Sequence, residues 1–123
     1  MATAANYTVV QDGDVTLKDP ITNDIDHQYG AFNAAGLSTS TVLVDRPVLE
    51  LKLNPHDDDA RLEVELNGKI VYAQTFSAGP IRSLTEVLAL GDLKATGNTL
   101  IVANRGSGSF TISDIKFAYK VNV

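Results

Sequence analysis

Three consecutive carboxylates form the densest group of potential metal ligands in the sequence. Asp57, Asp58 and Asp59 lie in an acidic stretch, residues 54–59, between two runs of apolar residues. Calcium takes about six to eight oxygen ligands, so these carboxylates could supply part of a calcium site. Adjacent side chains in a loop rarely converge on one point, and the stretch lacks the glycine and distal glutamate of an EF-hand loop. A solvated turn between two strands is therefore the interpretation that we favour.

A second candidate site lies in residues 23–33, which combine acids, amides, an imidazole and two aromatic rings. Sites that recognise sugars use such a mixture, because a ring covers apolar C–H faces while carboxylates and amides bond hydroxyl pairs. The ligand-binding residues predicted on this basis are Asp24, Asp26, His27, Tyr29, Phe32 and Asn33. In the alternative interpretation, which we weigh more heavily, the two rings pack the segment onto the core and the acids stay solvated.

The sequence lacks the motifs of the common catalytic sites. Its two histidines, His27 and His56, do not form an H-x-x-x-H pair, and cysteine is absent. Zinc hydrolysis normally needs three protein ligands, so we predict no zinc centre. Residues 106–109 (GSGS) superficially resemble a nucleophile elbow, but they are more typical of a flexible hairpin tip. We predict no catalytic residues and no enzymatic activity. The alternative is a small enzyme whose scattered carboxylates meet only in space.

The length and charge of the chain narrow the classes of partner. A chain of 123 residues fits one domain, residues 1–123. The hydrophobic fraction of 44% can form a core that needs no disulfide or structural metal. The net charge is −5 and the ten basic residues are scattered, which argues against nucleic acid. No apolar run reaches the roughly 18 residues of a membrane helix, so we predict no membrane insertion. Residues 1–10 lack the features of a signal peptide, so three alternatives stay open: a cytoplasmic protein, one from which a leader has been removed, or one released within an assembly.

Period-two alternation of apolar residues dominates the middle of the chain. Residues 49–53 and 61–66 both alternate apolar with charged side chains. This pattern predicts strands with one face in the core and the other in water. The Asn67-Gly68 dipeptide tolerates the positive φ angles of a type I′ turn. We therefore predict a hairpin formed by residues 61–66 and 69–76.

Further strands are predicted after this hairpin. Residues 81–88 favour a strand, with a short helix as the alternative, and residues 99–103 form a compact β-rich run. Residues 109–121 form a longer strand in which the apolar positions change parity. A β-bulge at Ser113-Asp114 would return both groups of apolar side chains to the core face, because one extra residue restores the register.

The first 45 residues are less regular. Residues 7–10, 15–17 and 41–44 are predicted strands. The long segment between the last two, residues 19–40, is rich in Asn, Asp, Gly and Ala and is predicted to be a loop. Loops of this length within one domain are often functional or mobile.

Three segments together resemble the galactose-binding-like jelly-roll domains. They are ARLEVELNGKIVYAQTF, LKATGNTLIVAN and FTISDIKFAYK, and the resemblance covers residues 47–121. It implies an all-β jelly-roll sandwich. It also implies a role as a carbohydrate-binding, lectin-like module, or as a cell-surface, virion or enzyme-accessory domain.

We therefore predict a single antiparallel β-sandwich of jelly-roll type with about seven to nine strands. Its function is predicted to be non-catalytic binding, with carbohydrate as the ligand, no resident cofactor, and calcium as the only metal considered. The alternative is a structural protein that forms a homo-oligomer or coats a larger particle.

Overall fold

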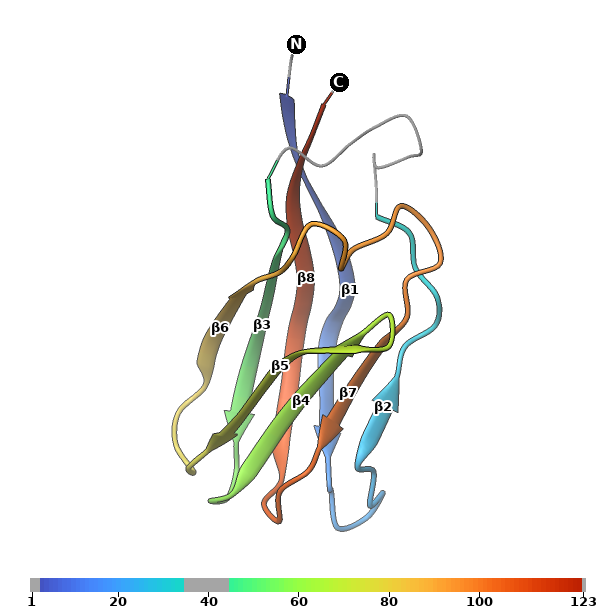
Figure 1. The fold of residues 1–123 in the computed structure, drawn as a ribbon. Helices are drawn as coiled ribbons and strands as arrows, with labels where there is room; N and C mark the ends of the chain where they lie inside the picture. The colour runs from blue at the N-terminus through green and yellow to red at the C-terminus, as the bar shows by residue number, and fades with distance from the viewer. Residues whose placement is uncertain (1–2, 35–44, 123) are drawn as a thin grey trace.

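The computed structural model describes residues 3–34 and 45–122, and these form two antiparallel four-stranded sheets packed face to face (Figure 1). The first sheet has the strand order β1-β8-β3-β6, and the second sheet has the order β2-β7-β4-β5. Along the chain the strands are β1 Thr3–Leu17, β2 Asp26–Gln28, β3 Val48–Pro55, β4 Ala60–Leu66, β5 Lys69–Phe76, β6 Arg82–Val87, β7 Leu100–Asn104 and β8 Phe110–Asn122. None of the described residues forms a helix that could cross a membrane. The predicted all-β jelly-roll sandwich is confirmed.

The core lies between the two sheets and is built from the alternating positions that the sequence indicated. In β4, every second residue from Ala60 to Leu66 is at most 1% exposed, and the leucines of β3 are buried in the same way. Burial of one such leucine contributes roughly 2 kcal/mol to folding. The intervening charged residues of β3 face away from the core, so the outer face of the first sheet is polar in this region.

The hairpin of β4 and β5 turns at the predicted dipeptide. Asn67 and Gly68 have φ angles of 52° and 83°, as a type I′ turn requires. The Asn67 side chain also accepts a hydrogen bond from the Thr99 backbone N–H at 2.9 Å, which ties the turn to the start of β7. The strand predicted over residues 81–88 is confirmed as β6, so the helix alternative is wrong.

The predicted bulge in β8 is also confirmed. Lys116 pairs with Glu50, and Ser113 pairs with Lys52, so two residues of β8 lie opposite one residue of β3. Asp114 takes a φ angle of 53° there. Aromatic and aliphatic side chains on both sides of the bulge are buried as a result, from Phe110 to Val121.

The N-terminal region differs from the prediction. Residues 7–10 and 15–17 belong to one strand, β1, which pairs with β8 along its length through two register shifts between Val9 and Asp14. Within the predicted loop, the short strand β2 pairs with the edge of β7 in the second sheet. The sequence of β2 alone does not indicate this pairing. The strand predicted over residues 41–44 lies outside the described residues.

Candidate functional site

Strand pairing brings side chains from distant parts of the chain into rows on the outer face of the first sheet. One row consists of Tyr7, Ala118, Val48 and Val87, which are directly paired across all four strands. The next row consists of Val9, Lys116, Glu50 and Thr85. Neighbouring strands are about 4.8 Å apart, so each row spans about 14 Å. An apolar row therefore lies beside a row whose centre is charged.

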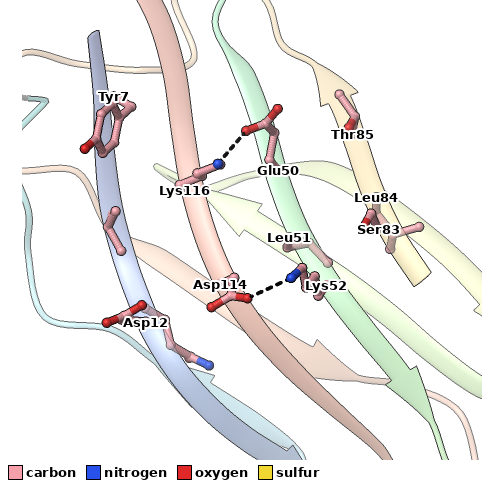
Figure 2. A pocket seen from close by; sticks show the side chains of 12 residues that line it. Tyr7, Asp12, Glu50, Leu51, Lys52, Ser83, Leu84, Thr85, Asp114 and Lys116 are labelled. Carbon is pink, nitrogen blue, oxygen red and sulfur yellow. Dashed lines mark ion pairs between the residues drawn. The ribbon is translucent and has the colours of Figure 1, made fainter. Parts of the chain in front are cut away.

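A groove of about 500 Å³ lies on this face and includes the charged row (Figure 2). Its floor and sides combine one aromatic ring, aliphatic side chains, hydroxyls, an amide and charged groups. The lining residues are Tyr7, Val9, Gln11, Asp12, Glu50, Leu51, Lys52, Ser83, Leu84, Thr85, Asp114 and Lys116. All four strands of the first sheet contribute to it, with β1 on one side and β6 on the other (Figure 2).

Two ion pairs cross the middle of the groove. Lys116 Nζ lies 3.4 Å from Glu50 Oε2, and Lys52 Nζ lies 3.4 Å from Asp114 Oδ2. Because these four side chains are between 37% and 52% exposed, water screens both pairs and each contributes little to folding. Their donors and acceptors can therefore form hydrogen bonds with a ligand at small cost.

Tyr7 is the aromatic residue of the groove. Its side chain is 64% exposed, and Val9, two residues along the same strand, is 49% exposed. A tyrosine ring has only two side-chain torsions, so placing it against a ligand costs little conformational entropy.

The aromatic residues of the predicted segment 23–33 are used differently. The Phe32 ring stacks on Phe117 of the core, with 5.6 Å between ring centroids. Tyr29 donates a hydrogen bond from its hydroxyl to Gln11 Oε1, and burial raises the pKa of this hydroxyl. His27 meets the Tyr29 ring edge-on at 4.5 Å. Both Tyr29 and Phe32 pack against the core, so the packing interpretation of this segment is confirmed for its two rings.

The polar residues of the same segment connect it to residues on either side of β7. Asp26 forms an ion pair with Arg105 at 2.6 Å, and Asn33 accepts a hydrogen bond from the Gly97 backbone N–H at 3.1 Å. The backbone carbonyl of Asp24 accepts a hydrogen bond from the Lys18 N–H, while the Asp24 side chain is exposed. The six predicted residues therefore lie along one edge of the second sheet, and the contacts described for Asp26, Tyr29, Phe32 and Asn33 are internal.

The three carboxylates of the acidic stretch point to separate partners. Asp57 accepts hydrogen bonds from the backbone N–H and hydroxyl of Ser109, and Asp59 accepts them from the same groups of Ser107. Asp58 accepts one from the Ala78 backbone N–H at 2.9 Å. The side-chain and backbone hydrogen bonds from Ser107 lower the pKa of Asp59.

Residues 106–109, predicted to be a flexible tip, pack closely against this acidic stretch. A Cβ atom on Gly106 would lie 1.9 Å from the Asp59 carbonyl oxygen, and one on Gly108 would lie 2.2 Å from that of Asp58. Among the described residues, no group of three or more histidines and acids is placed to hold a metal. Asp57 and Asp59 are turned toward residues 107–109 and Asp58 toward Ala78, so the three carboxylates of the predicted calcium site, Asp57, Asp58 and Asp59, do not converge on one point.

Sequence reasoning did not identify the groove. Tyr7, Glu50 and Lys116 are more than 40 residues apart and belong to no motif. The alternation in residues 49–53 places Glu50 and Lys52 on the solvent side, which is the one signal available. The strand order β1-β8-β3-β6 is needed to gather them, and no local pattern encodes it.

Comparison with known proteins finds relatives in structure but not in sequence. No protein-family model matches the chain, and no curated protein sequence matches it significantly. Dimeric latent PorU from Porphyromonas gingivalis matches 99% of this chain with a TM-score of 0.68 and 10% identity, although the match spans only 13% of that chain.

Two smaller proteins match along nearly their whole length. The CBM36-1 domain of a multidomain xylanase from the hindgut metagenome of Trinervitermes trinervoides has a TM-score of 0.51 and 12% identity, covering 96% of this chain and 98% of that one. The C-terminal CBM6 of LamC, a marine laminarinase from Zobellia galactanivorans, has a TM-score of 0.53 and 14% identity, covering 93% and 99%. At these identities the likeness concerns architecture alone, and this chain shares the jelly-roll β-sandwich fold of those two modules.

Proposed function

We propose that this protein is a non-catalytic carbohydrate-binding module whose ligand lies in the groove on the first sheet. The observation that carries the proposal is the pairing of an exposed aromatic ring, Tyr7, with the charged row of Lys116 and Glu50 on one open surface. Sugar rings have apolar faces and polar edges, so a surface with both kinds of group side by side suits them.

The shape of the surface favours a chain of sugars over a single ring. The groove reaches across four strands, and each row spans about 14 Å. A glycan lying across the strands could place its apolar faces on Tyr7 and Val9 while its hydroxyls meet the ion-paired groups.

The charges of the groove favour a neutral glycan. Lys52 and Lys116 are each paired with a carboxylate, and Asp12 adds a further acid among the lining residues. A uronic acid polymer would meet two lysines that are already paired and one additional negative charge. Binding should therefore depend only weakly on ionic strength, because no net charge attraction drives it.

The two carbohydrate-binding modules of similar fold are compatible with this function. They lend no support to a particular sugar or to a particular face of the sandwich, since their identity to this chain is 12% and 14%. The groove residues of this chain are the basis of the proposal.

Isothermal titration calorimetry with xylan and laminarin oligosaccharides tests the proposal directly, after a glycan array has selected the best binder. Tyr7→Ala should weaken binding at least about fivefold, because aromatic contact contributes roughly 1 kcal/mol. Ile21→Ala is the matched control, since Ile21 is 93% exposed and lies outside the groove. Equal affinity of the wild type and Tyr7→Ala for every bound glycan would remove the groove from consideration.

A second pair of variants separates the groove from segment 23–33. The double variant Asp24→Asn/His27→Ala changes that segment without removing its packed rings, and it should leave binding unchanged. Phe32→Ala is unsuitable for this purpose, because loss of a ring stacked on Phe117 should destabilise the fold by about 3 kcal/mol. Loss of binding in the double variant alone would place the ligand on the second sheet instead.

A further inference from the structure

β5 is an edge strand whose sequence does nothing to discourage pairing with another strand. It is the last strand of the second sheet and, among the described residues, pairs only with β4 (Figure 1). From Ile70 to Phe76 it contains no charge, no proline and no glycine, and most of its residues favour strands. Such a segment on an open edge readily adds another strand, because its outward N–H and C=O groups lack partners within the sheet.

The other three edge strands have features that limit such pairing. β2 is only three residues long, and β1 has two register shifts with Asp12 and Asp14 beside them. β6 carries Arg82 and Glu86 near its two ends. Short length, bulges and charges are the usual means by which edges are kept unpaired. On β5 the register shift beside Val64 leaves the run from Tyr72 to Phe76 regular.

We propose that a second copy of this chain pairs with β5, antiparallel and across a two-fold axis at Gln74. In this register Tyr72 lies opposite Phe76 of the second copy, and the Gln74 residues of the two copies lie opposite each other. Lys69 is the only charged residue of β5 and is its first residue, so the two lysines lie at opposite ends of the paired strands. No like charges therefore face each other. The two second sheets become one continuous sheet in a symmetric dimer.

A second copy suits this edge better than a charged peptide does. The strand offers no ionic group between residues 70 and 76, while its side chains pair well with themselves. Ala73 and Gln74 are exposed, so a partner strand can reach them, and the hydrogen bond that Gln74 Oε1 accepts from the Tyr72 hydroxyl at 2.6 Å lies within β5 itself. Because strand pairing alone buries a small area, the dimer should be reversible, with a dissociation constant between micromolar and millimolar.

Sedimentation velocity over a range of protein concentrations, without glycan, tests the dimer. The wild type should shift from monomer to dimer as concentration rises. Gln74→Lys should raise the dissociation constant at least about fivefold, because two lysines then lie directly opposite each other across the axis. Gln74→Glu should do the same for two carboxylates. A mixture of the two variants should dimerise again, because each lysine then meets a glutamate.

The controls distinguish this edge from the others and from misfolding. Ser83→Lys places the same charge on β6 and should leave the dimer intact, and circular dichroism should show that every variant is folded. A wild type that stays monomeric at all concentrations overturns the proposal. A dimer that survives both Gln74 variants, or one that is lost in Ser83→Lys, overturns it as well. Glycan binding by the groove is measured separately, so failure of one proposal leaves the other standing.

Discussion

The acidic loops at one end of the sandwich and the groove on the first sheet contain similar groups used in opposite ways. At the loop end, Asp57 and Asp59 accept hydrogen bonds from backbone N–H groups and serine hydroxyls of residues 107–109. In the groove, Glu50 and Asp114 each form an ion pair with a lysine side chain that is about half exposed. The first arrangement fixes loops, and the second leaves polar groups near the surface for a ligand.

The difference shows that a dense local cluster of acids is a poor guide to a binding site. The three aspartates of the turn between β3 and β4 accept hydrogen bonds from N–H groups of two neighbouring segments, residues 107–109 and Ala78, and do not face one common volume. Groups that face one volume come instead from paired strands, where side chains two residues apart share a face.

Among the substitutions that test this comparison, replacement of Gly106 at the loop end should reduce the free energy of unfolding the most. A Cβ atom there would lie 1.9 Å from the Asp59 carbonyl oxygen and 2.8 Å from the Arg61 backbone nitrogen. Backbone atoms cannot rotate away, so Gly106→Ala should destabilise the fold by about 2–3 kcal/mol in urea unfolding. Gly13→Ala on β1 is the control, since nothing lies within 4 Å of its Cβ position. Equal stability of the two variants would show that the loops at this end are loosely packed.

The strands were predictable where burial repeats with the period of the backbone. Alternation in residues 49–53 and 61–66 locates β3 and β4, and the change of parity in residues 109–121 locates the bulge of β8. In each case the signal is local, because one residue and the next point to opposite faces.

The groove was not predictable, and segment 23–33 was open to two interpretations, for the same physical reason. Whether Phe32 packs or binds depends on Phe117, which lies 85 positions later in the chain. Whether Glu50 is a solvated charge or part of a groove depends on Lys116 lying beside it in the sheet. Composition describes the groups that are present, while strand order decides which of them meet.

Acid pH should affect the loop end through Asp59. Its hydrogen bonds to Ser107 favour the ionised form and hold its folded-state pKa below the ordinary value of 3.8. The resulting stabilisation is present above about pH 4 and is lost as the pH falls through the lower, folded-state pKa. Asp59→Asn removes this contribution, so its urea midpoint should approach that of the wild type as the pH falls below 4. A constant difference between the two midpoints from pH 7 to pH 2 would contradict this role, and Ser107→Ala should reproduce the effect in part.

The smallest effect is expected in the groove, where the ion pair of Glu50 and Lys116 should contribute little to folding. A double-mutant cycle with Glu50→Gln and Lys116→Met should give a coupling energy of at most about 0.5 kcal/mol, because both side chains are more than a third exposed. The same cycle measured on glycan affinity should show a larger coupling, since a ligand that covers the pair excludes water from it. Strong coupling in folding with none in binding would contradict the contrast between the two regions. The groove charges would then stabilise the sheet, as Asp57 and Asp59 stabilise the loops. Weak coupling in folding with measurable coupling in binding is expected if the fold positions Glu50 and Lys116 but leaves their polar groups available to a ligand.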